Sequence, residues 1–249
     1  MRAAVIGRGR LGQAVAEQLR IRGAEVVLLS RVNGFDVTRP VRLEEHGRLD
    51  AVVEATDIFT INAQKARAFF QASTTNVNAA VAQAGIPLHL LISIVNCQDP
   101  ALAKNGYYAG KAAQEQAAAH AAAPVTTLRS TLWFEFARQN LDRTRIGPFR
   151  LVPQMRVQPV ALDSVAQIAA DRCLGTRSFR VLDVCGPEVM TLWKMTLGLP
   201  GSKGVPIPLP VPTRAGRAFR NGTLLPSPEA QIIGPRYSEW LRQKQQSPA

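Results

Sequence analysis

The chain has 249 residues, of which 46% are hydrophobic and 19% are charged. This length and composition are typical of one sizeable globular domain, or of a domain with a small lobe, and they exclude fibrous and disordered proteins. No run of about 18 uncharged apolar residues occurs, so we expect no transmembrane helix. The apolar run at residues 3–6 is too short for the core of a signal peptide, so we expect a cytoplasmic protein with no membrane partner.

The formal net charge of +12 is distributed unevenly. Residues 1–125 contain 13 Lys and Arg against 10 Asp and Glu, a net charge of +3, whereas residues 126–249 contain 17 against 8, a net charge of +9. A basic half is compatible with nucleic acid, an anionic substrate or a solvated surface. Because the basic residues are scattered and not interleaved with aromatic ones, we expect a small-molecule substrate and rank nucleic acid last among the partners.

The metal-ligating residue types are few and lie far apart in the sequence. Three cysteines and three histidines occur, at positions 97, 173 and 185 and at positions 46, 89 and 120. None of them has the close paired spacing of a zinc site. We therefore expect free thiols in a reducing compartment and no bound metal.

In chain order, short apolar runs alternate with helical patterns. We expect strands at residues 3–6, 25–29, 51–53, 88–95 and 125–128. Helices are predicted from Leu11, through Val15 and Leu19, to the closing Gly23, and at 63–84 and 106–122, with a short helix and loops at 39–48. This alternation predicts an α/β fold of the Rossmann type, in which helices cover both faces of a doubly wound parallel sheet.

The C-terminal part has a different character, because residues 200–213 contain five prolines and suit a rigid extended segment. We expect residues 1–130 to form the Rossmann core and residues 131–249 to contribute a smaller substrate lobe.

A glycine turn follows the first predicted strand and opens the first helix. Gly7, Gly9 and Gly12 fit the pattern G-x-G-x-x-G, which is weak alone but gains weight from this strand–turn–helix setting. The first glycine allows the tight turn, the second lets the backbone approach a pyrophosphate, and the third lets helix and strand pack closely. Free N–H groups and the helix dipole then attract the phosphates. The predicted cofactor-binding segment is Gly7, Arg8, Gly9, Arg10, Leu11 and Gly12.

The end of the second strand predicts which dinucleotide is preferred. An NAD site usually places a carboxylate there, whereas this strand ends in Ser30 and Arg31. Arg31 can pair with a 2′-phosphate, Ser30 can donate a hydrogen bond, and Arg8 or Arg10 can add charge. We therefore expect NADP(H), with NAD(H) as the second candidate. Asp36 follows shortly afterwards and is compatible both with a contact to adenine and with an ordinary loop role.

Tyr107 and Lys111 form the pattern Y-x-x-x-K on a predicted helix, where positions i and i+4 share a face. A nearby ammonium favours the phenolate, so we expect Lys111 to lower the pKa of Tyr107 and to make it a general acid for carbonyl reduction. Ser93, on the preceding buried strand, could orient the carbonyl. The predicted catalytic residues are Tyr107, Lys111 and Ser93, and Lys111 is also counted among the cofactor-binding residues.

The sequence resembles the short-chain dehydrogenase/reductase superfamily, and most closely its atypical NmrA-like, NAD(P)-binding branch. The resemblance runs nearly end to end, and it is carried by the glycine turn and by residues 72–76, 84–87, 91–95, 107–115, 128–131, 134–136, 157–161, 163–166, 185–188 and 237–241. It implies a Rossmann domain with a smaller C-terminal lobe, and the roles given above for Ser93, Tyr107 and Lys111. It further implies that residues 134–136 and the turn at Gln158 and Pro159 lie near the nicotinamide and the substrate.

The sequence departs from the family pattern at three places. Ile6 replaces a further glycine, residues 54–57 read Glu-Ala-Thr-Asp where small residues are usual, and residues 96–105 lack the expected early glycine. Two functions therefore stay open. The first is an NADP(H)-dependent oxidoreductase that reduces a small carbonyl, quinone or similar acceptor. The second is a non-catalytic NADP-binding regulator that senses redox state.

Overall fold

The computed structural model describes residues 1–201 and 204–246, and residues 202, 203 and 247–249 of the expected C-terminal part lie outside the described residues. The chain divides into two compact units. The first contains Met1–Arg129 and Val165–Leu182, and the second contains Ser130–Ser164 and Asp183–Ala249. The first segment of the first unit ends at Arg129, and residues 165–182, which the sequence analysis assigned to the C-terminal lobe, return to the first unit.

The first unit is built on parallel strands joined by helices. Its elements are β1 (Arg2–Ile6), α1 (Arg10–Ile21), β2 (Glu25–Leu29), the 3-10 helices η1 (Arg31–Asn33) and η2 (Glu44–His46), β3 (Ala51–Glu54), α2 (Ala63–Gln83), β4 (His89–Ile94), α3 (Gly106–Ala119), β5 (Val125–Ser130), α5 (Leu162–Cys173) and β9 (Val181–Cys185). Three of these elements, β5, α5 and β9, have residues in both units. The expected strands and long helices are confirmed. Helix α3 ends earlier than expected: the His120 Nδ1–H group at its C-cap donates to the Gln116 carbonyl at 2.8 Å, and Pro124 follows.

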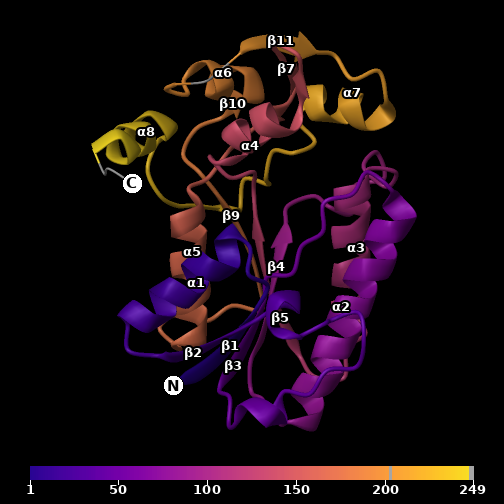
Figure 1. Ribbon diagram of the computed structural model, residues 1–249, viewed down its shortest axis with the longest axis vertical. Coiled ribbons are helices and arrows are strands. Elements are labelled where there is room, and N and C mark those ends of the chain that lie inside the picture. Colours follow the sequence, from indigo (N-terminus) through magenta and orange to yellow (C-terminus); the bar gives the residue numbers. More distant parts are fainter. Residues whose placement is uncertain (202–203, 247–249) are drawn as a thin grey trace. The chain divides into compact units, whose positions relative to one another are not determined.

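The seven-stranded sheet has the order β12-β9-β5-β4-β3-β1-β2, where β12 is Gln231–Ile232. Strand β1 pairs in parallel with β2 on one side and with β3 on the other. The chain therefore reverses its direction across the sheet after β2, so the carboxyl ends of β1 and β3 flank a topological switch point. Figure 1 shows α1 and α5 on one face and α2 and α3 on the other. This arrangement confirms the doubly wound Rossmann-type sheet.

Apolar periodicity explains how the first unit buries its core. Leu11, Val15 and Leu19 of α1 are at most 4% exposed, as their spacing predicted. Every residue of β4 is buried, which is usual for a central parallel strand covered on both faces. Two polar side chains of this strand, His89 and Ser93, are therefore buried as well, and both need hydrogen-bond partners.

The second unit consists of small sheets and short helices. Its remaining elements are α4 (Phe136–Arg143), β6 (Arg145–Ile146), β7 (Phe149–Pro153), β8 (Arg156–Val157), β10 (Met190–Thr191), α6 (Leu192–Leu197), β11 (Val205–Leu209), α7 (Arg214–Asn221), β12 and α8 (Tyr237–Gln246). The proline-rich segment contributes β11, which lies at the edge of the three-stranded sheet β11-β7-β6. An edge strand tolerates Pro206 and Pro208, because alternate nitrogens there face away from the neighbouring strand.

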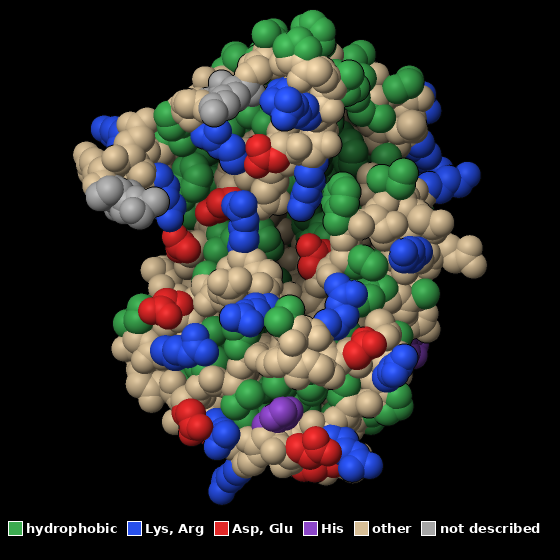
Figure 2. Space-filling view, viewed as in Figure 1, with side chains coloured by type: hydrophobic (Ala, Val, Ile, Leu, Met, Phe, Trp, Pro, Cys, Tyr) green, Lys and Arg blue, Asp and Glu red, His purple; other side chains and the backbone are tan. Residues whose placement is uncertain are grey.

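The surface carries both signs of charge. Figure 2 shows Lys and Arg side chains dispersed over the visible face, with Asp and Glu between them. Among the described residues, no helix combines the length and the apolar character that crossing a membrane would require.

Candidate dinucleotide and catalytic site

The glycine turn lies at the switch point, in contact with the segment that follows β3. Gly7 has a φ of +112°, and a Cβ atom there would lie 2.3 Å from the carbonyl oxygen of Ala55. A Cβ atom on Gly12 would lie 1.9 Å from the carbonyl oxygen of Gly7. Both positions therefore require glycine, the first for its backbone conformation and both for close packing. These are the roles that the motif predicted for its first and third glycines.

Gly9 differs from the other two glycines, because a Cβ atom there would meet nothing within 4 Å. Packing within the protein therefore does not require glycine at this position, whereas a pyrophosphate approaching the backbone would. Gly9 is also the N-cap of α1, no side chain caps the helix, and its first turn contains no acidic residue. The first N–H groups of α1 are thus available to an anion. Arg8 and Arg10 are exposed beside them, whereas the Leu11 side chain is buried and offers only its backbone.

The end of β2 holds a buried hydroxyl whose proton has no acceptor among the described residues. The Ser30 Oγ atom faces the Asn33 backbone N–H in a capping box, and the Ser30 backbone N–H donates to Asn33 Oδ1 at 2.7 Å. Asn33 Nδ2 in turn donates to the Leu28 carbonyl at 2.8 Å, which braces the turn that follows the strand. Arg31 starts η1 with an exposed side chain. A ligand hydroxyl or phosphate at this strand end would supply the acceptor that the Ser30 hydroxyl lacks.

Asp36 is occupied by its own loop. One carboxylate oxygen accepts hydrogen bonds from the Thr38 N–H at 3.0 Å and from the Thr38 hydroxyl at 2.8 Å. The backbone hydrogen bond from Thr38 is the main reason why the pKa of Asp36 lies below its usual value. This geometry favours the loop role over the contact with adenine, the two alternatives that the sequence left open.

Tyr107 and Lys111 lie on the face of α3 that packs against Phe70 of α2. The ring centroids of Tyr107 and Phe70 are 6.3 Å apart, and the Lys111 Nζ atom lies 4.7 Å from the Phe70 ring centroid. A Cβ atom on Gly110 would lie only 2.4 Å from Phe70 Cδ2, so a glycine there allows α2 and α3 to approach. The predicted sharing of one helix face is thus present.

Lys111 is anchored inside the protein. It is 4% exposed, and its Nζ atom donates to the Ile92 carbonyl at 2.9 Å and to Gln114 Oε1 at 2.8 Å. Burial lowers the pKa of Lys111 below its usual value, and the carboxylates of Asp57 and Glu54 counteract part of this effect. An ammonium has three N–H groups, of which two have these partners, and the Phe70 ring lies beside the same nitrogen.

The expectation that Lys111 lowers the pKa of Tyr107 is wrong for this structure. Burial raises the pKa of Tyr107 well above its usual value, and the negative charge of Asp57 adds to the increase. The physical reason is that the Lys111 ammonium is directed to Ile92 and Gln114, while the phenol lies in apolar surroundings. Tyr107 is therefore a phenol, and not a phenolate, at neutral pH.

Ser93 is joined to an ion pair and not to Tyr107. It is 3% exposed, its hydroxyl donates to the Glu115 carboxylate, and its Oγ atom lies 4.0 Å from Cys97 Sγ. Two Arg129 nitrogens bind the same carboxylate at 2.8 and 2.7 Å. Burial alone would raise the pKa of Glu115, but the hydrogen bonds from Arg129 and Ser93 hold it below its usual value. The role of Ser93 toward a carbonyl stays a prediction.

A buried polar cluster adjoins Lys111, and the sequence did not predict it. Its centre is Glu54, the last residue of β3, which is fully buried and hydrogen-bonded to five side chains, those of Thr56, Ser73, Thr74, His89 and Gln114. The only sequence signal was the unusual segment 54–57. The partners could not be identified from sequence, because they come from α2, β4 and α3 as well as from the segment after β3.

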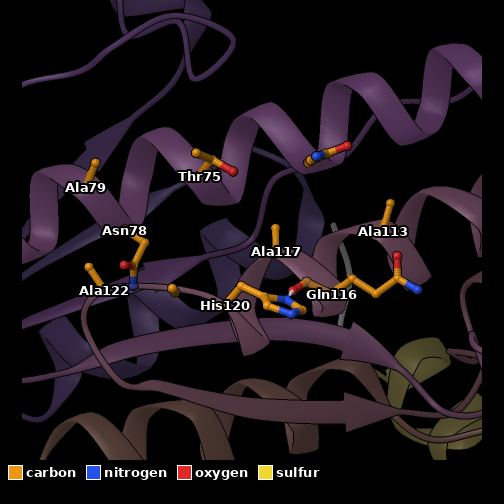
Figure 3. Close-up of a pocket in the computed structure, with 10 residues that line it drawn as sticks. Thr75, Asn78, Ala79, Ala113, Gln116, Ala117, His120 and Ala122 are labelled. Carbon is orange, nitrogen blue, oxygen red and sulfur yellow. Dashed lines mark hydrogen bonds between the residues drawn. The ribbon is translucent and has the colours of Figure 1, made fainter.

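A surface groove of about 610 Å³ lies on α2 and α3 (Figure 3), away from the glycine turn. Its lining includes Gln71, Thr75, Asn78, Gln116, Ala117 and His120, and no carboxylate or ammonium contributes to it. The groove contains no predicted site residue. Among the described residues, no group of three or more His, Cys, Asp or Glu is arranged to hold a metal ion.

Comparisons with known proteins bear on the fold. No protein-family model matches the sequence, and the search of curated proteins finds no match either. Solved structures do match. A dTDP-4-dehydrorhamnose reductase from Clostridium acetobutylicum superimposes with a TM-score of 0.73 at 13% identity, covering 98% of this chain and 100% of the reductase.

Two further structures were determined with a dinucleotide. The Bordetella bronchiseptica enzyme WbmH in complex with NAD+ has a TM-score of 0.71 at 14% identity, and the match covers 96% of this chain and 95% of WbmH. The dTDP-4-dehydrorhamnose reductase from Bacillus anthracis in complex with NADP has a TM-score of 0.67 at 14% identity, with coverages of 97% and 96%. The chain therefore shares the fold of these enzymes. The Rossmann-type fold expected from the resemblance is confirmed, and the NmrA-like branch stays a prediction.

Proposed function

We propose that this protein is an oxidoreductase that binds NADP(H) and reduces a small carbonyl, quinone or similar acceptor by hydride transfer. The observation that carries the proposal is that the first unit contains both the glycine turn and the face of α3 on which Tyr107 and Lys111 lie. Both follow the carboxyl ends of strands in a parallel sheet, which is where open α/β folds bind ligands. The complexes of similar folds with NAD+ and with NADP support a dinucleotide here.

Three features of the chain fit a dinucleotide. The space beside Gly9 is open, and no side chain caps the first N–H groups of α1. The buried Ser30 hydroxyl has no acceptor for its proton among the described residues. The exposed Arg31 side chain next to Ser30 supports NADP(H) over NAD(H), because no carboxylate occupies the end of β2. NAD(H) remains the second candidate cofactor.

The chemistry assigned to the protein's own residues is proton donation. When bound, the reduced cofactor supplies a hydride to the acceptor carbon. Tyr107 gives its phenolic proton to the acceptor oxygen as negative charge develops there. With an aldehyde or ketone this oxygen becomes an alkoxide, a much stronger base than a phenolate, so the raised pKa of Tyr107 still permits the transfer. Lys111, on the same helix face, is assigned to binding the cofactor. A tyrosine that rests as a phenol favours reduction over the reverse oxidation, which would need a phenolate first.

A second candidate function is a regulator that binds NADP(H) without turnover. The specific observation in its favour is that the Ser93 hydroxyl donates to Glu115 and so is engaged inside the protein. In this alternative, Tyr107 and Lys111 serve the binding of the cofactor and the packing against Phe70.

The decisive experiment combines binding and turnover. NADPH fluorescence titration of the wild type should show saturable binding, and its absence would refute both candidates. Consumption of NADPH is then followed with a panel of aldehydes, ketones and quinones. Tyr107→Phe should reduce kcat by about 10²- to 10⁴-fold with NADPH affinity retained.

Tyr108→Phe is the matched control, since it removes a phenolic hydroxyl from the buried ring of the next residue. It should retain turnover. Turnover that survives Tyr107→Phe would exclude Tyr107 as the acid. Tight NADPH binding together with no consumption across the panel would support the regulator.

A further inference from the structure

Glu54 is a buried carboxylate of the first unit, and all of its side-chain partners are hydrogen-bond donors. Ser73 Oγ donates to Glu54 Oε1 at 2.6 Å, Thr74 Oγ1 lies 2.9 Å from both carboxylate oxygens, and Gln114 Nε2 donates at 2.9 Å. Burial alone would raise the pKa of Glu54, but the hydrogen bond from His89, the electrostatic attraction to His89 and the hydrogen bonds from Ser73 and Thr74 lower it below its usual value. The group is therefore ionised although it is fully buried.

The hydrogen bonds of Asn78 determine the tautomer of His89. The Ala123 N–H donates to Asn78 Oδ1 at 3.0 Å, and Asn78 Nδ2 donates to the Ala123 carbonyl at 2.9 Å, which together fix the orientation of the amide. The second Nδ2 hydrogen is then directed at His89 Nδ1, 3.2 Å away, so Nδ1 accepts and Nε2 carries the proton. His89 Nε2 donates to Glu54 Oε2 at 3.1 Å. His89 is thus a hydrogen-bond donor to the carboxylate.

The Gln114 amide connects Glu54 to Lys111. Its Nε2 atom donates to the carboxylate at 2.9 Å, and its Oε1 atom accepts from Lys111 Nζ at 2.8 Å. All three side chains are at most 4% exposed, so water screens the two charges little. The amide is polarised in the direction that stabilises both the ammonium and the carboxylate.

We propose that Glu54 is a positioning residue for Lys111, the buried counter-ion that acts through the Gln114 amide to keep the ammonium charged and hydrogen-bonded in its place on α3. The neutral amide between them prevents direct ion pairing. The purpose of the Lys111 charge rests on the proposed function, whereas the ionisation of Lys111 does not depend on it.

Three other ionisable groups lie near Lys111. The exposed Asp57 carboxylate raises the pKa of Lys111 more than Glu54 does. Glu115 is paired with Arg129 through two hydrogen bonds. The Cys97 thiol remains protonated, because burial and the nearby Glu115 charge raise its pKa to about 12. Glu54 differs from these groups because it is fully buried and is joined to the ammonium through the Gln114 amide.

The first test measures the ionisation of Lys111 directly and needs no cofactor. The chain contains six lysines, so the ¹³Cε signals of labelled lysine can be assigned with Lys111→Met. In a pH titration, Glu54→Gln should lower the Lys111 midpoint by about one to two pH units relative to the wild type. A midpoint that moves by less than about 0.3 units would overturn the proposal.

Two further variants separate the charge from the packing. Ser73→Ala removes one donor from the carboxylate but leaves its charge, and it should leave the Lys111 midpoint close to the wild-type value. Gln114→Met keeps the carboxylate and removes the bridge, and it should lower the midpoint by an intermediate amount. If Glu54→Gln fails to fold, an unchanged midpoint in Gln114→Met would overturn the proposal by itself.

The second test links the ionisation to the site. The affinity for NADPH should decrease at alkaline pH with a midpoint that falls in Glu54→Gln in parallel with the Lys111 titration, and Lys111→Met should abolish this pH dependence. A wild type that does not bind NADPH would refute the proposed function while the NMR titration still decides the role of Glu54. NADPH binding with an unmoved Lys111 midpoint would refute the role of Glu54 alone.

Discussion

The glycine turn and the polar region around α3 are built by different means. The turn works through backbone atoms of residues 7–12, and its constraints are contacts with Ala55 and between Gly12 and Gly7. The α3 region works through side chains that come from β3, α2, β4, α3 and β5, and that meet in a buried hydrogen-bond network. A backbone site can be identified from local sequence, whereas a side-chain network depends on residues that only folding brings together. Four predictions test this difference.

The largest effect should come from Gly12→Ala compared with Gly9→Ala. A Cβ atom at Gly12 would lie 1.9 Å from the Gly7 carbonyl oxygen, so we expect a loss of about 3 kcal/mol or more in the free energy of unfolding. Gly9→Ala should change that free energy by less than about 1 kcal/mol, because the space is open, and yet weaken NADPH binding. Urea unfolding and fluorescence titration measure the two quantities. Equal destabilisation by both variants would contradict the assignment of Gly9 to a ligand.

The next effect concerns the ion pair in the α3 region. Arg129→Met leaves the buried Glu115 carboxylate without its cation, so we expect a loss of about 2–3 kcal/mol in unfolding free energy. The matched control is Arg22→Met, which breaks the pair between Arg22 and Asp171 on a more exposed surface and should cost less than about 1 kcal/mol. A cost for Arg129→Met as small as that of the control would mean that the network adds little stability.

Acid should destabilise the α3 region specifically. The pKa values of Glu54 and Glu115 are lower in the folded protein than the usual 4.5, so the stability they contribute is present above that pH and is lost as the pH falls through the folded-state values. The urea midpoint should therefore fall steeply below about pH 4.5 in the wild type, and less steeply in Glu115→Gln. Glu17→Gln, at an exposed position on α1, serves as the control and should reproduce the wild-type slope.

The smallest effect should be seen at the end of β2. Arg31→Ala should weaken NADPH binding by about tenfold and leave NADH binding nearly unchanged, because the guanidinium addresses only the 2′-phosphate. Asp36→Asn should alter neither, since the carboxylate serves its own loop. Equal losses for both dinucleotides in Arg31→Ala would remove the basis for preferring NADP(H).

The sequence predicted much of the first unit and less of the second. The strands and long helices of residues 1–130 follow from apolar periodicity and glycine, and the matching folds confirm the class. The return of residues 165–182 to the first unit was not predicted. The apolar periodicity of a strand does not indicate which neighbouring strand it will pair with. The short strands and helices of the second unit have two to ten residues, too few for a periodic pattern to stand out.

For this protein, the sequence by itself determined the glycine turn and the pairing of Tyr107 with Lys111 on one helix face, because both depend on spacing within a few residues. Only the tertiary structure decided the electrostatics of that face. Burial reversed the expected direction of the Tyr107 pKa shift, and the Lys111 ammonium was found bonded to Ile92 and Gln114. The tertiary structure also revealed Glu54 as a buried carboxylate that the Gln114 amide connects to Lys111. Spacing along the chain determines which side chains share a surface, but ionisation depends on desolvation and on charges from distant segments, which exist only in the folded protein.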